Sequence, residues 1–455
     1  MPLLGIALWW WRLATVSFSS VTEALKAASS RADSPTSSEP RQFSRAKHLD
    51  RILEKRAITP VFQPLIDLRT NQVIAYEALS RGPAGSPLQR PDLLFEAARD
   101  LGRVAELDWT CRAVALEAAL EGKLGQGVTL FMNVEPDVLG SPVPDELKFV
   151  QRMAERSLRV ILEVTERALT VRPAELLRAL EWARERWWGV ALDDVGANPD
   201  SLALMPFVKP DVIKLDFRFL HEQPSAELVR ILDVVHAESS RTGAVILAEG
   251  IETEENLQHA LSLGATMGQG WYFGRPEPLP SKIERPLHAV PMRKVPPASA
   301  LPTPFELVAD LPDVARGGLP DLQRLSRELE DQAAELKEPP PVVLAAMHQA
   351  AFFDTDTAAR YESLMANCAF LGIAGTDMPA VPAPGIRGVS LRPHDPLADQ
   401  WVVVVLSPVF QGAVVGRLVE TRGDDAVYDY VSTRDRDTVV AVADTLMRRM
   451  GMVPD

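Results

Sequence analysis

Residues 61–79 read VFQPLIDLRTNQVIAYEAL and contain two apolar runs, Val61 to Asp67 and Val73 to Glu77. The few residues around Thr70, Asn71 and Gln72 that separate the runs leave no room for a helix. The two strands must therefore form an antiparallel hairpin, since parallel neighbours need a long crossover connection.

The same pattern of a short apolar run that ends in a polar residue continues along the chain, with helical spacing between most runs. Such a series predicts a (β/α)8 barrel whose active rim is assembled from many strands, modified by an antiparallel first strand. The further runs are Thr129 to Asn133, Val160 to Glu163, Val190 to Asp194, Val212 to Asp216, Ala244 to Glu249 and Ala265 to Gln269. The expected helices are Pro91 to Leu120, Pro144 to Glu155, Pro173 to Arg186, Ala226 to Ser240 and Thr253 to Leu263.

Length and composition set the broad class. The 455 residues are too many for one ordinary core, and 46% hydrophobic with 24% charged residues is typical of a folded globular protein. A net charge of -14 argues against binding duplex nucleic acid, which needs a basic face. The two cysteines, Cys111 and Cys368, have no metal-site or disulfide spacing, which favours a cytoplasmic location.

We expect four segments along the chain. Residues 1–46 form a disordered tail, since Ser29 to Ser44 is rich in Ser, Pro, Arg and Glu. The apolar start, Met1 to Trp11, is too short for a stable membrane anchor, so it is a loose or interfacial tail or reflects a misplaced start codon. The barrel occupies 47–283, a proline-rich linker 284–304, and a smaller α+β domain 305–455.

The second domain is expected to begin with helices and to continue with strands before a final helix, Thr438 to Arg449. The expected helices are Leu319 to Leu336, Val342 to Phe352 and Thr357 to Leu371. The expected strands are Gly388 to Leu391, Gln400 to Leu406, Gly412 to Glu420 and Val427 to Ser432.

Acidic residues gather at the carboxyl ends of the barrel strands, where a barrel collects its functional groups. These are Glu77, Glu163, Asp193, Asp194 and Glu249. Two like charges about 4 Å apart at an effective dielectric near 20 repel by roughly 4 kcal/mol, so either carboxyls protonate or cations lie among them. A lone strand-end acid is more often a helix cap or salt-bridge partner, but successive strands carry these acids together.

Oxygen donors of this kind, with Asn133 adding a carbonyl, suit hard cations such as Mg²⁺ or Mn²⁺. Asp193 and Asp194 can face two ions from one strand end. Two such ions suit in-line displacement at phosphorus. Lys214 is placed to hold or deprotonate the attacking water, and Arg81 to grip a phosphate.

These residues lie within motifs that resemble the EAL-domain cyclic di-GMP phosphodiesterases, over roughly Leu49 to Pro280. The motif that names the family is Glu77-Ala78-Leu79. The others are Phe62-Gln63-Pro64, Asn133-Val134, Glu163-Val164-Thr165-Glu166, Asp193-Asp194, Lys214-Leu215-Asp216, Glu249-Gly250-Ile251-Glu252-Thr253 and Gln269-Gly270-Trp271.

The resemblance implies a modified TIM barrel that opens cyclic di-GMP to linear pGpG with two Mg²⁺ or Mn²⁺ ions, in a homodimer. It implies Glu77, Asn133, Glu163 and Asp193 as ligands of one ion, Asp194 as ligand of the second, and Glu249 in the metal and phosphate site. Lys214, with Glu77 and Glu249, takes the catalytic role. Arg81, Gln63 and Gln269 contact substrate, and Glu166 and Glu252 brace the loop after the aspartate pair. That loop, 195–202, departs from the family pattern, which puts the rate or its regulation in question more than the ligands.

Several stretches of the second domain resemble the DICT domain, a sensory module attached to cyclic di-GMP enzymes and two-component proteins. They include Ala351-Phe352-Phe353, Arg360-Tyr361, Gly388-Val389, Asp395-Pro396-Leu397, Trp401 to Leu406 and Ser432-Thr433-Arg434-Asp435. His394, Arg434 and Arg436 either mark a pocket there or lie on the solvated surface. A dimerisation or scaffold unit is the alternative for the whole domain.

The favoured interpretation is a metal-dependent phosphodiesterase regulated by its C-terminal domain, because degenerate receptors usually lack ligands that are present here. The alternatives are a receptor that binds cyclic di-GMP without cutting it and signals through the attached domain, and an acidic structural adaptor.

Overall fold

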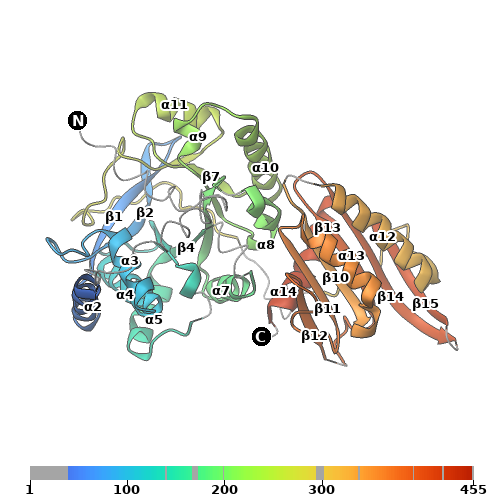
Figure 1. Ribbon diagram of the computed structural model, residues 1–455. Helices are drawn as coiled ribbons and strands as arrows, with labels where there is room; N and C mark the ends of the chain where they lie inside the picture. Colours follow the sequence, from blue (N-terminus) through green and yellow to red (C-terminus); the bar gives the residue numbers. More distant parts are fainter. Residues whose placement is uncertain are drawn as a thin grey trace, which may run out of the picture.

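The computed structural model describes residues 39–138, 141–165, 173–197, 199–293, 302–336, 339–392, 394–422 and 425–452. Within these residues the strands form two sheets, a closed barrel and a seven-stranded mixed sheet. Figure 1 shows the barrel on the left and the second sheet on the right, with helix α14 between them.

All eight expected apolar runs form strands that join in chain order into a closed barrel. β1 pairs antiparallel with both β2 and β8, and the other neighbours are parallel, so the predicted hairpin and fold class are confirmed. The strands are β1 (Thr59–Asp67), β2 (Gln72–Arg81), β3 (Thr129–Asn133), β4 (Arg159–Thr165), β5 (Gly189–Val195), β6 (Val212–Leu215), β7 (Val245–Ala248) and β8 (Met267–Gly268).

Helices surround the barrel close to the expected positions. The longest expected helix is divided at Gly102, whose φ of +65° is one that glycine adopts readily. Ser225 caps α10 by accepting from the backbone N–H of Leu228, and Gly243 ends it with a φ of +74°. The helices are α3 (Pro91–Asp100), α4 (Val104–Glu121), α5 (Lys148–Ser157), α7 (Pro173–Glu185), α8 (Met205–Val208), α9 (Arg218–His221), α10 (Ala226–Thr242) and α11 (Glu254–Ser262).

The second sheet has the order β12-β11-β10-β13-β14-β15-β9. Its strands are β9 (Ala315–Gly318), β10 (Val342–Gln349), β11 (Phe370–Thr376), β12 (Arg387–Leu391), β13 (Gln400–Leu406), β14 (Gln411–Arg422) and β15 (Asp425–Thr433). Helices α12 (Leu319–Glu335) and α13 (Thr355–Met365) cover one face, and α14 (Arg436–Met452) covers the other.

Two predictions in this domain were wrong. Val342 to Phe352 was expected to be helical, but β10 is a central strand between β11 and β13. Its alternate residues enter different cores, with Leu344 on the α14 side and Ala345 on the α12 side. A strand buried on both faces reads as a continuous apolar run, which periodicity cannot separate from a buried helix. The helix expected to reach Leu371 ends at Met365, because Leu371 belongs to β11.

The structure describes only parts of the expected tail and linker, since residues 1–38 and 294–301 lie outside the described residues, and the described parts pack against the barrel. Helix α2 (Glu39–Glu54) begins before residue 47, and Leu49 is fully buried against α3 and α4. Residues 1–38 lie outside the described residues, so the disordered tail stays a prediction. Val290, in the expected linker, packs into the barrel interior. Among the helices that the structure describes, none has the length and apolar character needed to cross a bilayer.

Candidate metal and phosphate site

An apolar layer inside the barrel positions the predicted site residues. Phe131, Ile161, Ala191, Val212 and Leu247 fill the interior. Side chains two residues apart in a strand point to the same face, so the residues two positions further on also point inward, one layer nearer the carboxyl end. Those residues are Asn133, Glu163, Asp193, Lys214 and Glu249. The apolar layer therefore aims one polar side chain from each of five strands at the same rim.

Asp194 reaches the site through an irregularity in β5. Neighbouring residues of a regular strand point to opposite faces, so Asp193 and Asp194 would normally diverge. Asp194 instead has a φ of +56°, and the pairing of β5 with β6 shifts between Leu192 and Val195. Aspartate tolerates this left-handed conformation better than most residues. As a result, one carboxylate oxygen each from Asp193, Asp194 and Glu249 lie within 4.8 Å of one another.

Lys214 stands at the centre of this cluster. Its ammonium nitrogen lies 2.6 Å from Glu163 Oε1, 2.8 Å from Asp193 Oδ1 and 2.7 Å from Glu249 Oε1. The lysine side chain is 1% exposed, whereas that of Glu249 is 22% exposed toward the rim. One buried cation is therefore shared by three carboxylates.

The balance of charge shifts the pKa values of the cluster in a consistent pattern. Burial alone would lower the pKa of Lys214, but Asp193, Glu163 and Glu249 outweigh it and hold that pKa well above its usual range. Burial, with further repulsion from neighbouring acids, raises the pKa of Glu163 and of Glu249 well above the ordinary range. Burial and the adjacent Asp193 raise the pKa of Asp194 to about 7. The cluster thus has more negative charge than Lys214 can neutralise.

Glu77 forms the other side of the site. Its oxygens accept from Asn133 Nδ2 at 2.9 Å and from Gln269 Nε2 at 2.5 Å. Gln269 Nε2 also lies 3.1 Å from Gln63 Oε1, and Gln63 is directly opposite Glu77 in the hairpin. Burial opposes ionisation, but Lys214, Gln269 and Asn133 together lower the pKa of Glu77. The antiparallel β1 thus supplies Gln63 to this side of the site.

The residues fit divalent cations. Glu163 Oε2 is buried without a hydrogen-bond partner among the described residues, and the buried oxygens Glu163 Oε1 and Asp193 Oδ1 share the single ammonium of Lys214. Buried carboxylate oxygens without hydrogen-bond donors are costly unless cations compensate them. The oxygen-rich donor set of carboxylates with one amide is the one that Mg²⁺ and Mn²⁺ prefer.

The other predicted residues are placed less closely. Arg81 ends β2, where the charge of Glu77 partly offsets the lowering of its pKa by burial. Glu252 is exposed, and its backbone N–H donates to Asn256 Oδ1 at 3.3 Å. Glu166 lies outside the described residues. In the C-terminal domain, Arg434 and Arg436 bond mainly to neighbouring loop and strand groups.

Sequence reasoning missed Arg218 at the start of α9. Its Nε lies 3.1 Å from Asp216 Oδ1, and its guanidinium also donates to the carbonyl of Gly196 in the loop after the aspartate pair. Gly196 has a φ of +107°, and a Cβ there would lie 2.7 Å from the Phe219 ring. A charged residue two positions after a strand-end acid was the available signal for this link between the loop and β6.

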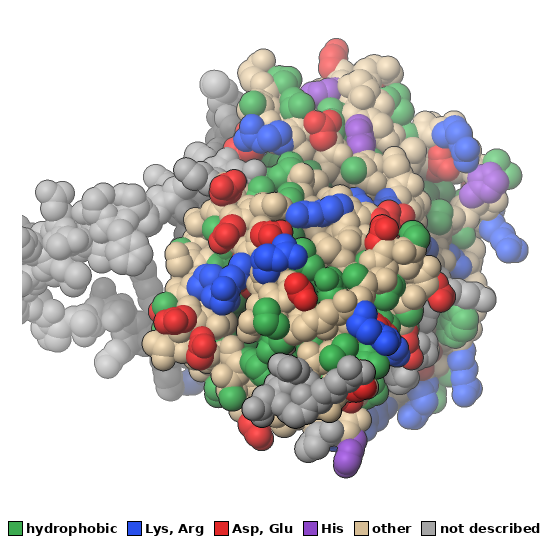
Figure 2. All heavy atoms as spheres, turned by 90° about the vertical axis from the view of Figure 1, so that its right-hand side faces the viewer, with side chains coloured by type: hydrophobic (Ala, Val, Ile, Leu, Met, Phe, Trp, Pro, Cys, Tyr) green, Lys and Arg blue, Asp and Glu red, His purple; other side chains and the backbone are tan. Residues whose placement is uncertain are grey.

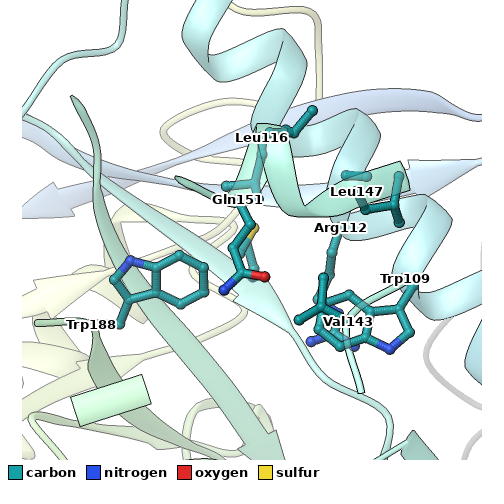
Figure 3. A pocket seen from close by; sticks show the side chains of 10 residues that line it. Trp109, Arg112, Leu116, Val143, Leu147, Gln151 and Trp188 are labelled. Atoms are coloured by element: carbon teal, nitrogen blue, oxygen red, sulfur yellow. The ribbon is translucent and has the colours of Figure 1, made fainter. Parts of the chain in front are cut away.

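A separate pocket lies on the flank of the barrel, behind β3. Figure 3 shows Trp109, Arg112, Gln151 and Trp188 around it. Its volume is about 20 Å³, which suits a single water molecule. Among the described residues, Arg112 Nε, Gln151 Oε1 and Trp188 Nε1 are buried without hydrogen-bond partners. This pocket shares no residue with the acidic rim.

Comparisons with known proteins agree with the two sheets. Residues 46–276 match the EAL domain model, and residues 319–417 match the DICT model, described as a sensory domain in diguanylate cyclases and two-component systems. The first of these matches covers the barrel, and the second covers most of the seven-stranded sheet.

Individual relatives are more distant. The chain is 30% identical over 235 residues to the probable cyclic di-GMP phosphodiesterase PdeG of Escherichia coli, covering 50% of this chain and 46% of that protein. It is 28% identical over 257 residues to the cyclic di-GMP phosphodiesterase RocR of Pseudomonas aeruginosa, covering 54% of this chain and 64% of that protein. A solved structure, the PaMucR phosphodiesterase in complex with c-di-GMP, is 24% identical with a TM-score of 0.46 and covers 52% of this chain and 98% of that one. The chain thus spans less than two thirds of either curated relative.

Proposed function

Because this chain belongs to the EAL-domain family and carries a C-terminal DICT sensory domain, we propose that it hydrolyses cyclic di-GMP to linear pGpG. The observation that carries the proposal is the rim itself. The rim surrounds one buried lysine, Lys214, with an excess of negative charge. Its residues are Glu77, Asn133, Glu163, Asp193, Asp194 and Glu249. Similarity to the probable cyclic di-GMP phosphodiesterase PdeG and to the cyclic di-GMP phosphodiesterase RocR supports the choice of substrate.

The ligand set divides between two ions. Glu77, Asn133, Glu163 and Asp193 would hold one Mg²⁺ or Mn²⁺, Asp194 would hold the second, and Glu249 would lie beside both. When bound, a pair of divalent ions lowers the pKa of a coordinated water and neutralises phosphate oxygens. Burial and Asp193 raise the pKa of Asp194 to about 7, so a cation that bound there would compete with a proton near neutral pH.

In this proposal Lys214 would donate a hydrogen bond to the attacking water once a bound metal ion takes over one of its three carboxylate partners. Its surrounding carboxylates hold its pKa well above the usual range, which keeps the ammonium charged and unsuited to removing a proton. Arg81 contacts a substrate phosphate through its planar guanidinium, and Gln63 and Gln269 orient Glu77. The C-terminal domain regulates the reaction.

The test is conversion of cyclic di-GMP by the purified full chain with Mn²⁺ or Mg²⁺, followed by chromatography of pGpG. Glu77→Ala is expected to abolish product, because it removes a ligand and leaves Asn133 and Gln269 without their acceptor. Glu284→Ala, which replaces a carboxylate that is 88% exposed, is the matched control and is expected to retain activity.

Three outcomes separate the candidate functions. Product from the wild type and from Glu284→Ala, with none from Glu77→Ala, supports the phosphodiesterase. Nucleotide binding by calorimetry without any pGpG would instead identify a receptor. No nucleotide affinity at all would overturn both and leave the structural adaptor.

A further inference from the structure

The middle of helix α14 is buried on every side. The seven consecutive residues from Val442 to Arg448 are each 5% exposed or less. A terminal helix on a sheet normally keeps one face in solvent, so burial all round requires a second covering layer. The DICT sheet is one layer. The other is the barrel, since α14 also contacts α7 and α8, and its apolar residues join one continuous core with theirs.

The outer face of the C-terminal domain differs from this inner one. Figure 2 shows the side away from the barrel, where Lys and Arg side chains alternate with Asp and Glu. The C-terminal domain also carries an ion pair between Arg316 and Asp429, with an arginine that is 61% exposed. Side chains of both signs mixed in this way are typical of solvated surface. The interdomain side is therefore built differently from the free surface of the same domain.

The barrel is thinly covered where α14 packs. The connection from β5 to β6 holds a short 3-10 turn (Pro199–Leu204) and α8, which has four residues. Four residues of helix extend only about 6 Å, too little to cover neighbouring strands. The 17 residues of α14 extend about 25 Å. The C-terminal helix thus completes the outer layer at the one connection that joins Asp194 to Lys214.

Polar contacts fix α14 in register on the barrel. Asp437, Asp444 and Arg448 share one face of the helix, being seven and four residues apart. Asp444 Oδ2 accepts from Lys209 Nζ at 2.7 Å, and Arg448 donates to Glu181 Oε1 in α7 at 3.0 Å. Arg448 Nε also donates to Asp444 at 2.9 Å, so the contacts form one network. Asp437 lies 3.8 Å from Arg241 of α10 at the exposed edge.

This network ends next to the candidate site's strands. Lys209 follows α8 in a left-handed conformation with a φ of +50°, and its carbonyl accepts from Arg184 at 2.7 Å. Arg184 also pairs with Asp211, whose carboxylate accepts from the backbone N–H of Val190 in β5 at 2.8 Å. Asp211 directly precedes β6, and Lys214 is three residues further on. These contacts link α14 to both β5 and β6.

We propose that α14 positions the segment between Asp194 and Lys214, and that Lys209, Asp444 and Arg448 are positioning residues through which the DICT domain controls divalent-ion binding at the rim. The inference rests on the proposed function for its consequence in catalysis, but not for the coupling itself. A conformational change of the DICT sheet would reach the rim through α14, because this helix packs directly against the barrel and the contact is not a flexible hinge.

The test uses the metal-free full chain. Mn²⁺ affinity is measured by calorimetry, and hydrogen exchange is followed in a peptide that covers Leu202 to Leu215. Lys209→Met is expected to weaken Mn²⁺ binding by about two- to thirtyfold, the range that coupled sites commonly show, and to increase exchange in that peptide. Lys209→Arg retains the charge, so it is expected to keep most of the Mn²⁺ affinity and most of the protection from hydrogen exchange. Asp444→Asn tests the same contact from the other helix.

Arg316→Ala is the control, since it breaks an exposed ion pair between the edge strand β9 and its neighbour β15, and it is expected to change neither readout. Exchange over Thr59 to Asp67 reports whether each variant remains folded. Unchanged Mn²⁺ affinity and exchange in both Lys209→Met and Asp444→Asn would overturn the proposal. Unfolding of Lys209→Met would also contradict it, because that side chain is 25% exposed and the apolar contact remains. Mn²⁺ coupling without pGpG production would refute the phosphodiesterase and leave this inference standing.

Discussion

Buried ionisable side chains occur both at the barrel rim and in the C-terminal domain, but their charges are balanced differently. In the C-terminal domain, Glu330 accepts from Arg360 at 2.7 Å and from the Tyr361 hydroxyl at 2.6 Å, so both of its oxygens are bonded. At the rim, three carboxylates share the single ammonium of Lys214, and Glu163 Oε2 has no hydrogen-bond partner among the described residues.

The difference separates a structural cluster from a chemical one. A buried charge with complete partners rigidifies the fold and leaves nothing for a ligand to add. A buried cluster with excess charge costs stability until a counter-ion arrives. His348 follows the first pattern, since its ring nitrogens bond to the Ala398 carbonyl at 2.8 Å and to the Tyr428 hydroxyl at 2.9 Å. The rim alone follows the second among the clusters compared.

Replacing Lys214, the positively charged side chain at the centre of the rim, gives the largest expected effect. Lys214→Met should reduce pGpG formation by about 10²- to 10⁴-fold with saturating Mn²⁺, since it removes the donor to the attacking water. In the metal-free protein it should also lower the free energy of unfolding by about 3–5 kcal/mol, because the buried carboxylates lose their counter-charge. Urea denaturation with and without Mn²⁺ measures the second effect.

The matched control is Lys282→Met, which replaces a lysine that is 85% exposed in the same domain. It should change neither pGpG formation nor the free energy of unfolding. Retention of activity within tenfold by Lys214→Met would show that the lysine balances charge without acting on the water. Equal stability loss with and without Mn²⁺ would contradict the view that cations complete this cluster.

The stability of the metal-free protein as a function of pH tests the same excess of negative charge at the rim. The pKa of Asp194 rises from its ordinary 3.8 to about 7 on folding. The folded protein thus holds a proton that the unfolded chain releases, and stability should fall as pH rises between about 4 and 7. The raised pKa values of Glu163 and Glu249 act in the same direction. The lowered pKa of Glu77 has the opposite effect on stability, but only at pH values below the ordinary pKa of 4.5.

Thermal unfolding from pH 5 to pH 8, with and without Mn²⁺, measures this dependence. Mn²⁺ should flatten the curve, because it replaces the proton, and its affinity should rise with pH. Asp194→Asn should remove part of the slope. A metal-free stability that stays constant or increases over this range would mean that the carboxylates at the rim ionise freely.

The barrel and its rim were predictable because their signals are local. Alternation within each strand places Glu163 two residues after Ile161 and Asp193 two after Ala191, so each polar residue follows its own apolar anchor. The antiparallel hairpin followed from a short turn. The position of Asp194 was predictable only as a neighbour of Asp193, since its left-handed conformation depends on the shifted pairing of β5 with β6.

The parts that sequence reasoning missed depend on contacts between distant segments. Lys209 and Asp444 are 235 residues apart, and nothing near either residue indicates a partner. The apolar run of β10 has the length and composition of a buried helix, and only its neighbours β11 and β13 make it a strand. The roles of the individual ligands stay predictions until metal is bound.

The smallest effect should come from the balanced cluster. Glu330→Gln weakens two hydrogen bonds to a charged acceptor, which should lower the free energy of unfolding by about 1.5–3 kcal/mol. Mn²⁺ affinity should stay within twofold, because the cluster lies on the α12 side of the sheet, opposite α14. Glu328→Gln, an exposed glutamate of the same helix, should alter neither. A clear loss of Mn²⁺ affinity in Glu330→Gln would show that both faces of the DICT sheet communicate with the rim, and the contrast between the two clusters would fail.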